Sequence, residues 1–182
     1  MKEVVDLINN ARKRGIYITA DMYPYHYAGG GRIIPIVRNA GWAPFHLPSD
    51  LEPFAELRKK MRDKDLADSE RQKLREQYIE ELAEALADKS KREQIRKSVL
   101  KGEPHKPSSV ALAGWDSYLI NVSEKNAPLI GKILSDIAKE QNRDPFDVAA
   151  DLVIDEPDLY VACGVMSEDD MKYAMEQDWL MF

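Results

Sequence analysis

This sequence contains few of the residues that build disulfide frameworks and metal sites. It has one cysteine, Cys163, and three histidines among 182 residues. A single cysteine excludes an internal disulfide and fits a reducing compartment. The histidines, His26, His46 and His105, lie far apart in the sequence and form neither an HxH nor an i, i+4 pair. Their spacing therefore does not predict a metal site.

Long apolar runs and an excess of basic residues are also missing. No stretch approaches the roughly 20 apolar residues that a membrane-spanning helix requires. The net charge of −6 argues against a general polyanion binder, and the densest basic cluster, at 58–62, lacks interleaved aromatic residues. The acidic start, with Glu3 and Asp6, does not resemble a signal peptide. We therefore expect a cytoplasmic protein that binds neither a membrane nor nucleic acid.

One strand and the loop after it are the most informative part of the chain. β-Branched and apolar residues predict a strand at 16–20. One carboxylate and two phenol groups follow directly, on Asp21, Tyr23 and Tyr25. A loop with three consecutive glycines is expected at 26–32, where the backbone could approach a ligand closely. α/β enzymes present their sites in this way. The alternative is a strand end whose tyrosines only cover a core.

Four blocks of the sequence resemble a known enzyme family. The blocks are LINNARKRGIYITADMYPYHYAGG at 7–30, GKILSDIA at 131–138, DPFDVAADL at 144–152 and MSEDD at 166–170. In this order they resemble stretches of the N-acyl-D-amino-acid deacylases, or D-aminoacylases, of the amidohydrolase superfamily. The first block joins an amphipathic helix, ended by Gly15, to the strand and loop just described.

The resemblance implies an α/β fold that is a fragment of a TIM-barrel amidohydrolase, consisting of late βα units with an inserted, mainly helical, lid-like subdomain. The pattern of expected elements divides the chain into a barrel helix–strand–loop unit at 1–41, a helical insertion at 42–107 and a returning barrel segment at 108–182. In the family, the zinc-binding histidines precede the matching segments and the catalytic aspartate follows them. We therefore expect no catalytic residue and no bound zinc here, and zinc only in a longer parent enzyme.

The resemblance also implies a substrate class. These enzymes hydrolyse the amide bond of N-acyl-D-amino acids, and the second tyrosine of their YPY motif, Tyr25 in this chain, holds the substrate carboxylate. Arg32 is predicted from chemistry, as the nearest cation beyond the glycines, because arginine binds a carboxylate bidentately. Tyr23, Asp21 and His26 complete the predicted substrate-binding residues. The family commonly has small hydroxyl residues where this chain has glycines, so the carboxylate contacts, or the substrate, differ.

Periodicity predicts the remaining elements. A long amphipathic helix is expected from the spacing of Leu74, Tyr78, Leu82, Ala85 and Leu86. Shorter helices are expected around 54–61 and 95–99, and further helices at 130–141 and 145–154, the last with Asp144 as N-cap. A capping box at 167–170 predicts one more helix. Strands are expected at 110–114, 118–122, 159–163 and 179–182.

A second class of function remains open at this point. The expected partners of the enzyme segment are a small-molecule N-acyl-D-amino acid and the remainder of the parent barrel. The alternative is a stand-alone helical module that binds a protein through the charged helices of 42–107. Cys163, within an apolar stretch, is expected to be a small core residue.

Overall fold

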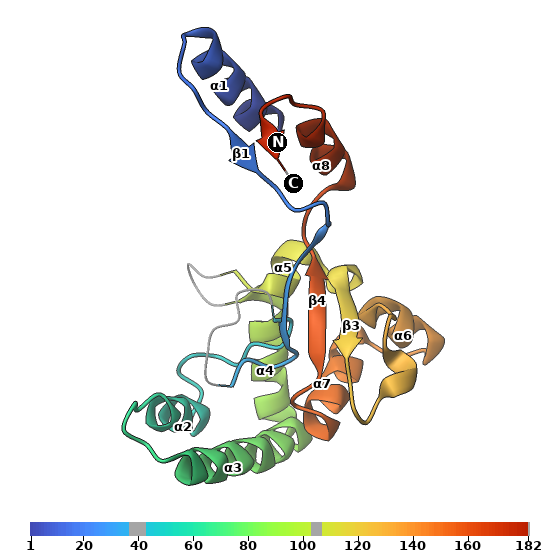
Figure 1. Cartoon of the computed structure of the whole chain (residues 1–182). Coiled ribbons are helices and arrows are strands. Elements are labelled where there is room, and N and C mark those ends of the chain that lie inside the picture. The colour runs from blue at the N-terminus through green and yellow to red at the C-terminus, as the bar shows by residue number, and fades with distance from the viewer. Residues whose placement is uncertain (37–42, 103–106, 182) are drawn as a thin grey trace. The chain divides into compact units, whose positions relative to one another are not determined.

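The computed structural model describes residues 1–36, 43–102 and 107–181 (Figure 1). It is a mixed α/β structure that is mostly helical, with one two-stranded and one three-stranded sheet. The chain forms two compact units. Unit 1 comprises Met1–Ala28 and Gly164–Phe182, and unit 2 comprises Gly29–Cys163. The α/β class expected from the sequence is thus present, while no barrel closes among the described residues.

Unit 1 contains two helices, each leading into a short strand. Helix α1 (Lys2–Lys13) precedes β1 (Ala20–Asp21), and α8 (Glu168–Met175) precedes β5 (Leu180–Met181). The strands pair in parallel, with Ala20 opposite Leu180 and Asp21 opposite Met181. Trp179 is buried, and its indole Nε1 donates a hydrogen bond of 2.8 Å to Asn9 Oδ1 on α1. This contact ties the two halves of the unit together.

The first strand is much shorter than the sequence predicts. We expected a strand at 16–20, but only Ala20 and Asp21 are paired. Tyr17 is 86% exposed, and no strand covers Ile16–Thr19. The reason is that a strand exists only where a neighbour accepts and donates its hydrogen bonds, and β5 offers two residues.

Unit 2 contains most of a three-stranded sheet with the order β2-β4-β3. Its strands are β2 (Tyr27–Arg32), β3 (Tyr118–Val122) and β4 (Tyr160–Gly164). Strands β3 and β4 are antiparallel, with Tyr118 opposite Cys163. Cys163 is 1% exposed, so its prediction as a small core residue is confirmed. The predicted strands at 118–122 and 159–163 are also confirmed.

The glycine-rich segment after Tyr25 forms a strand, so its prediction as a loop is wrong. Residues Tyr27–Arg32 form β2, the neighbour of β4. A Cβ atom added to Gly30 would lie 3.0 Å from the Val161 carbonyl oxygen of β4, so a side chain there would require β4 to shift by a few tenths of an ångström. This glycine therefore allows two strands to approach each other closely. From the sequence alone, the same glycine could equally have allowed the backbone to approach a ligand.

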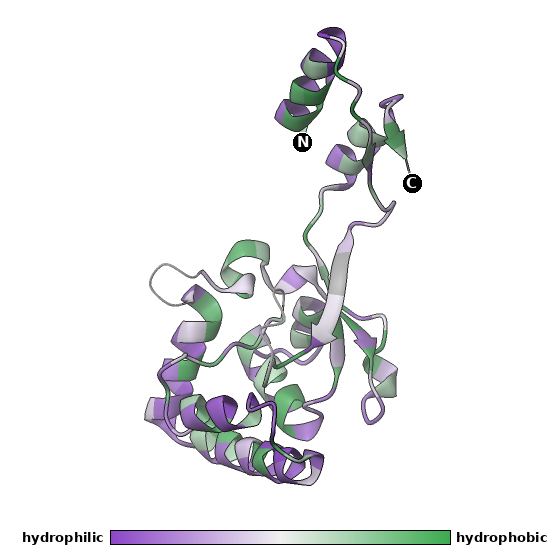
Figure 2. Cartoon of the chain, turned by 60° about the vertical axis from the view of Figure 1, so that its left-hand side comes forward, coloured by the Kyte–Doolittle hydropathy of each residue, from purple (hydrophilic) through white to green (hydrophobic). Residues whose placement is uncertain are grey.

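The helices of unit 2 mostly follow the predicted spacing. They are α2 (Phe54–Met61), α3 (Asp68–Ala87), α4 (Lys89–Lys101), α5 (Ser109–Ala113), α6 (Leu134–Glu140) and α7 (Pro145–Asp155), with short 3₁₀ turns η1 (Trp115–Ser117) and η2 (Ala127–Leu129). In Figure 2, hydrophilic and hydrophobic residues lie side by side along these helices. The apolar residues Tyr78, Leu82, Ala85 and Leu86 of α3 are buried, as the periodicity predicts.

Two aromatic pairs mark the core of unit 2. The ring of Phe54 on α2 meets Tyr78 on α3 edge to face, with 5.0 Å between centroids. Phe45 stacks on Phe146 of α7 at 5.6 Å. Both phenylalanines of the second pair are fully buried. The residues before α2 and the helix α7 therefore share one core, although they are about 100 positions apart in the sequence.

One predicted strand is a helix, and one predicted helix is shorter than expected. Residues 110–114 were expected to form a strand, but α5 covers most of them, because the hydroxyl of Ser108 accepts a hydrogen bond from the Ala111 amide at 2.9 Å. The helix expected at 130–141 begins only at Leu134, since Gly131 and Lys132 hydrogen bond instead to Ile120 of β3. Within the described ranges, no helix combines the length and the apolar character needed to cross a membrane.

Candidate functional site

Four of the five predicted substrate-binding residues lie in unit 1, in the segment that leaves β1. Because β1 and β5 are parallel, their carboxyl ends meet at the same edge of the sheet. Asp21 ends β1 at this edge and is exposed. Tyr23 and Tyr25 follow, and their rings stack with 6.0 Å between centroids and 28° between planes. The structure thus brings the two tyrosines of the YPY motif together.

These tyrosines do not cover a core. Tyr23 is 47% exposed and Tyr25 is 63% exposed. His26 is exposed as well, and its ring lies 4.4 Å from that of Tyr27. The backbone of His26 is held in place, since its carbonyl oxygen accepts a hydrogen bond of 3.2 Å from the Met166 amide. Large aromatic side chains are therefore presented to solvent on a short segment anchored at both ends, an arrangement suited to binding a small molecule.

The fifth predicted residue, Arg32, belongs to unit 2 and has a carboxylate partner there. Its Nε lies 2.5 Å from Asp158 Oδ1, and Arg75 Nη2 on α3 lies 2.6 Å from Asp158 Oδ2. The guanidinium of Arg32 also lies 5.8 Å from the centroid of the Tyr160 ring. About half of the Arg32 side chain is exposed. The two arginines thus converge on one carboxylate at the surface of unit 2.

Arg32 lines a cleft of about 880 Å³ within unit 2. The backbone of Gly30 and Gly31 forms one wall, and α3 contributes Arg71 and Arg75. Arg71 stabilises the loop between α2 and α3, because its guanidinium donates hydrogen bonds to the carbonyl oxygens of Met61, Asp63 and Leu66. This cleft has the volume of a typical small-molecule site, and its cations are already hydrogen bonded within the protein.

The described residues do not form a zinc site. No three side chains of histidine, cysteine, aspartate or glutamate gather within the described ranges where they could hold a metal ion. His26 belongs to unit 1 and His46 to unit 2, and His105 lies outside the described residues. The described residues thus do not fit the zinc that the sequence resemblance implies for a parent enzyme.

Comparison of this chain with known proteins identifies no family. No family model, curated protein or solved structure matches this chain.

Sequence reasoning missed the residues around Arg32, namely Arg71 and Arg75, which line the same cleft, and its partner Asp158. Arg71 and Arg75 are separated by four positions on α3, which places them on one helix face, and this spacing is a signal that the sequence contains. Asp158 offers no such signal, because it lies in a turn before β4 and meets Arg32 across 126 positions of sequence. Only the tertiary fold brings that carboxylate between the two arginines.

Proposed function

We propose that this chain is the substrate-binding and lid segment of a TIM-barrel, metal-dependent hydrolase that deacylates N-acyl-D-amino acids. The observation that carries the proposal is the parallel pairing of β1 with β5, from whose carboxyl edge Asp21, Tyr23 and Tyr25 emerge. Barrel hydrolases bind their substrates at this edge of their parallel strands. The four sequence blocks that resemble D-aminoacylases point to the same substrate class.

The role of this chain in such an enzyme is to bind and orient the substrate. The substrate carries a carboxylate, which needs hydrogen-bond donors, and the exposed phenol of Tyr25 can donate one. Stacking on Tyr23 limits the rotation of the Tyr25 ring, so less conformational freedom is lost when a ligand binds. In the parent enzyme, zinc would supply a Lewis acid, but its ligands are not among the described residues.

The role of Arg32 in binding a substrate carboxylate remains a separate prediction, because Arg32 lies in unit 2. Its pair with Asp158 is exposed on both sides, and exposed ion pairs contribute only about 0–1 kcal/mol. A substrate carboxylate could therefore replace Asp158 at the guanidinium at small cost. For the same reason, Arg32→Met should leave folding nearly unchanged, which makes it a clean test of binding.

The proposal is tested in the full reading frame that contains this segment. The purified protein should release free D-amino acids from N-acetyl-D-amino acids and act much less on the L-enantiomers. Tyr25→Phe should lower kcat/KM by about ten- to a hundredfold, since it removes a charge-assisted hydrogen bond worth roughly 1.5–3 kcal/mol. Tyr17→Phe is the matched control, because Tyr17 lies in the same unit, is 86% exposed and precedes β1. It should leave kcat/KM unchanged.

Amide analogues that lack the substrate carboxylate show whether Tyr25 recognises this carboxylate or only supports the fold. They should be poor substrates for the unaltered enzyme and lose little further activity in Tyr25→Phe. Equal losses for acid and amide substrates would show that Tyr25 supports structure only. A natural reading frame limited to these 182 residues, without D-amide hydrolysis, would instead favour the stand-alone helical module.

A further inference from the structure

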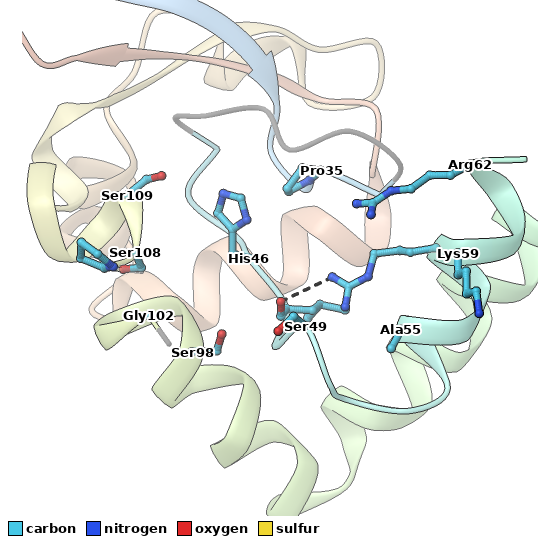
Figure 3. Close-up of a pocket in the computed structure, with 13 residues that line it drawn as sticks. Pro35, His46, Ser49, Ala55, Lys59, Arg62, Ser98, Gly102, Ser108 and Ser109 are labelled. Carbon is cyan, nitrogen blue, oxygen red and sulfur yellow. Dashed lines mark hydrogen bonds between the residues drawn. The ribbon is translucent and has the colours of Figure 1, made fainter. Parts of the chain in front are cut away.

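A second concave site lies in unit 2, and Pro35 lines both this site and the cleft that contains Arg32. It is a pocket of about 350 Å³ between the end of α2, the end of α4 and the start of α5 (Figure 3). None of the residues expected from the sequence to bind substrate lines it. The pocket instead contains most of the basic cluster at 58–62, for which the predicted function has no role.

One face of α2 supplies the cations of this pocket. Ala55, Arg58, Lys59 and Arg62 line it, at positions i, i+3, i+4 and i+7. This is the spacing of a single helix face. A neighbouring face of α2 carries Phe54, Leu57 and Met61, which are all buried. Burial of the apolar face therefore fixes the helix so that the residues at 55, 58, 59 and 62 line the pocket.

Arg58 is held in position by backbone groups. Its Nη2 donates to the Pro48 carbonyl oxygen at 2.7 Å, and its Nη1 donates to that of Leu47 at 3.4 Å. These carbonyl groups orient the guanidinium without neutralising it, since they carry no net charge. No aspartate or glutamate is found among the described residues that line the pocket. The chain as a whole is acidic, whereas α2 contributes three basic residues and no acidic residue to the lining of this pocket.

The wall across from α2 carries hydroxyl groups. Figure 3 shows Ser98 on α4 and Ser108 and Ser109 at the start of α5, with His46 between them and the basic side chains. The three serines are 8%, 5% and 6% exposed. Ser108 Oγ already donates to the Val99 carbonyl oxygen at 2.7 Å, which fixes the start of α5 against α4. The pocket is therefore a preformed cavity with cations on one side and polar groups on the other.

We propose that this pocket binds a small molecule that carries a phosphate group. A phosphate monoester bears a charge of about −1.5 to −2 at pH 7 and presents three strong acceptor oxygens, which matches several converging cations better than a single carboxylate does. The remaining walls are apolar, with Pro35, Leu47, Ala55 and Pro107. They suit the carbon skeleton of the ligand. The volume lies near the lower limit for small-molecule sites, so the ligand is of the size of a sugar phosphate.

This inference does not rest on the proposed hydrolase function. The pocket lies within unit 2, whereas the tyrosines at the edge of β1 lie in unit 1. The phosphate site can therefore be present whether or not the chain belongs to a deacylase. Its experiment uses the 182-residue chain itself and needs no catalytic activity.

The test is a titration followed by NMR, with inorganic phosphate, glucose 6-phosphate, glucose and acetate as separate probes. Glucose 6-phosphate should bind with a dissociation constant of about 1 mM or below, and inorganic phosphate more weakly. Amide shifts should change at the end of α2 and around Ser98, Ser108 and Ser109. Lys59→Gln and Arg62→Gln should each weaken binding about tenfold, since each removes a charge-assisted contact.

Lys60→Gln is the matched control. Lys60 lies in the same basic run, but it does not line the pocket and is paired with Glu56 at 2.9 Å. Its replacement removes the same charge from the same helix and should change the dissociation constant less than twofold. The proposal is overturned if Lys60→Gln weakens binding as much as Lys59→Gln, if acetate binds as tightly as glucose 6-phosphate, or if no probe shifts the amides of the pocket. Unchanged far-UV spectra of the variants exclude a folding defect as the cause.

Discussion

At the scale of single residues, the buried carboxylate of Glu156 stabilises the fold. It is 6% exposed and lies at the end of α7. Its oxygens accept hydrogen bonds from the Ser123 hydroxyl at 2.5 Å, from the Glu124 amide at 2.6 Å and from Asn126 Nδ2 at 3.1 Å. Burial alone would raise the pKa of this carboxyl. The hydrogen bonds outweigh burial and lower its pKa to about 2.

This shift predicts how stability depends on pH. A carboxyl whose pKa is lower in the folded state than in the unfolded state stabilises the fold above the unfolded value of 4.5, and this contribution is lost as the pH falls toward 2. A decrease of the pKa from 4.5 to about 2 corresponds to about 3 kcal/mol. Urea unfolding should therefore show Glu156→Gln to be much less stable than the unaltered chain at pH 7, with the difference shrinking between pH 5 and pH 2.

Glu124→Gln is the control for this prediction, since Glu124 is exposed and only its backbone contacts Glu156. It should leave the free energy of unfolding nearly unchanged. A constant difference between the unaltered chain and Glu156→Gln across this pH range would show that the carboxyl charge does not stabilise the turn at 123–126.

At the scale of secondary-structure elements, the junction of α4 and α7 combines a helix cap, ion pairs and cation–π contacts. Asp144 caps α7, because its carboxylate accepts from the Phe146 amide at 2.9 Å, and it also lies 2.7 Å from Arg96 Nη2 on α4. Arg92 pairs with Asp147, and both arginines lie over the Phe146 ring, at 5.5 and 5.0 Å from its centroid. The DPFD block thus has a structural role that is independent of any substrate.

Asp144→Ala should therefore be clearly destabilising. It removes a cap, which typically costs about 0.5–2 kcal/mol, and leaves the partly buried Arg96 with a weaker partner. We expect a loss of about 1–3 kcal/mol in the free energy of unfolding. Asp151→Ala on the same helix is the control, because Asp151 pairs with Arg143 at the surface, and it should cost less than about 1 kcal/mol. Similar losses in both variants, measured by urea unfolding, would argue against the capping role of Asp144.

At the scale of the whole molecule, the division into two units predicts two levels of stability. Unit 1 has a two-stranded sheet and few buried side chains, whereas unit 2 contains most of the buried apolar residues. Small cores give low stability, so we expect unit 1 to open before unit 2. In hydrogen exchange, the amides of α1 and α8 should exchange faster than those of α3 and α7.

Trp179→Ala provides the decisive variant for this prediction. Trp179 is 4% exposed in unit 1, and removing a buried tryptophan typically costs about 3–5 kcal/mol. Protection should be lost in α1 and α8 while α3 and α7 keep theirs. Phe146→Ala is the reciprocal variant, since Phe146 is fully buried in unit 2. Loss of protection throughout the chain in Trp179→Ala would show that the units unfold as one.

The sequence by itself determined the elements whose signals are local. The spacing of Tyr78, Leu82 and Leu86 defined α3, and the caps at Asp144 and Ser167 defined the starts of α7 and α8. Such signals suffice because a helix satisfies its hydrogen bonds within itself, so residues three and four apart decide it. The sequence also placed Asp21, Tyr23 and Tyr25 at the end of a strand, because hydrophobic pattern and polarity change there within a few positions.

Only the tertiary structure decided the features that depend on distant partners. The glycine-rich segment is a strand because β4 lies beside it, with Gly30 close to Val161, and β1 is short because β5 is short. Arg32 meets Asp158 across 126 positions, and the cations of α2 face hydroxyl groups from α4 and α5. Strand pairing, ion pairing and pockets join residues that are far apart in the sequence, so no local pattern contains them.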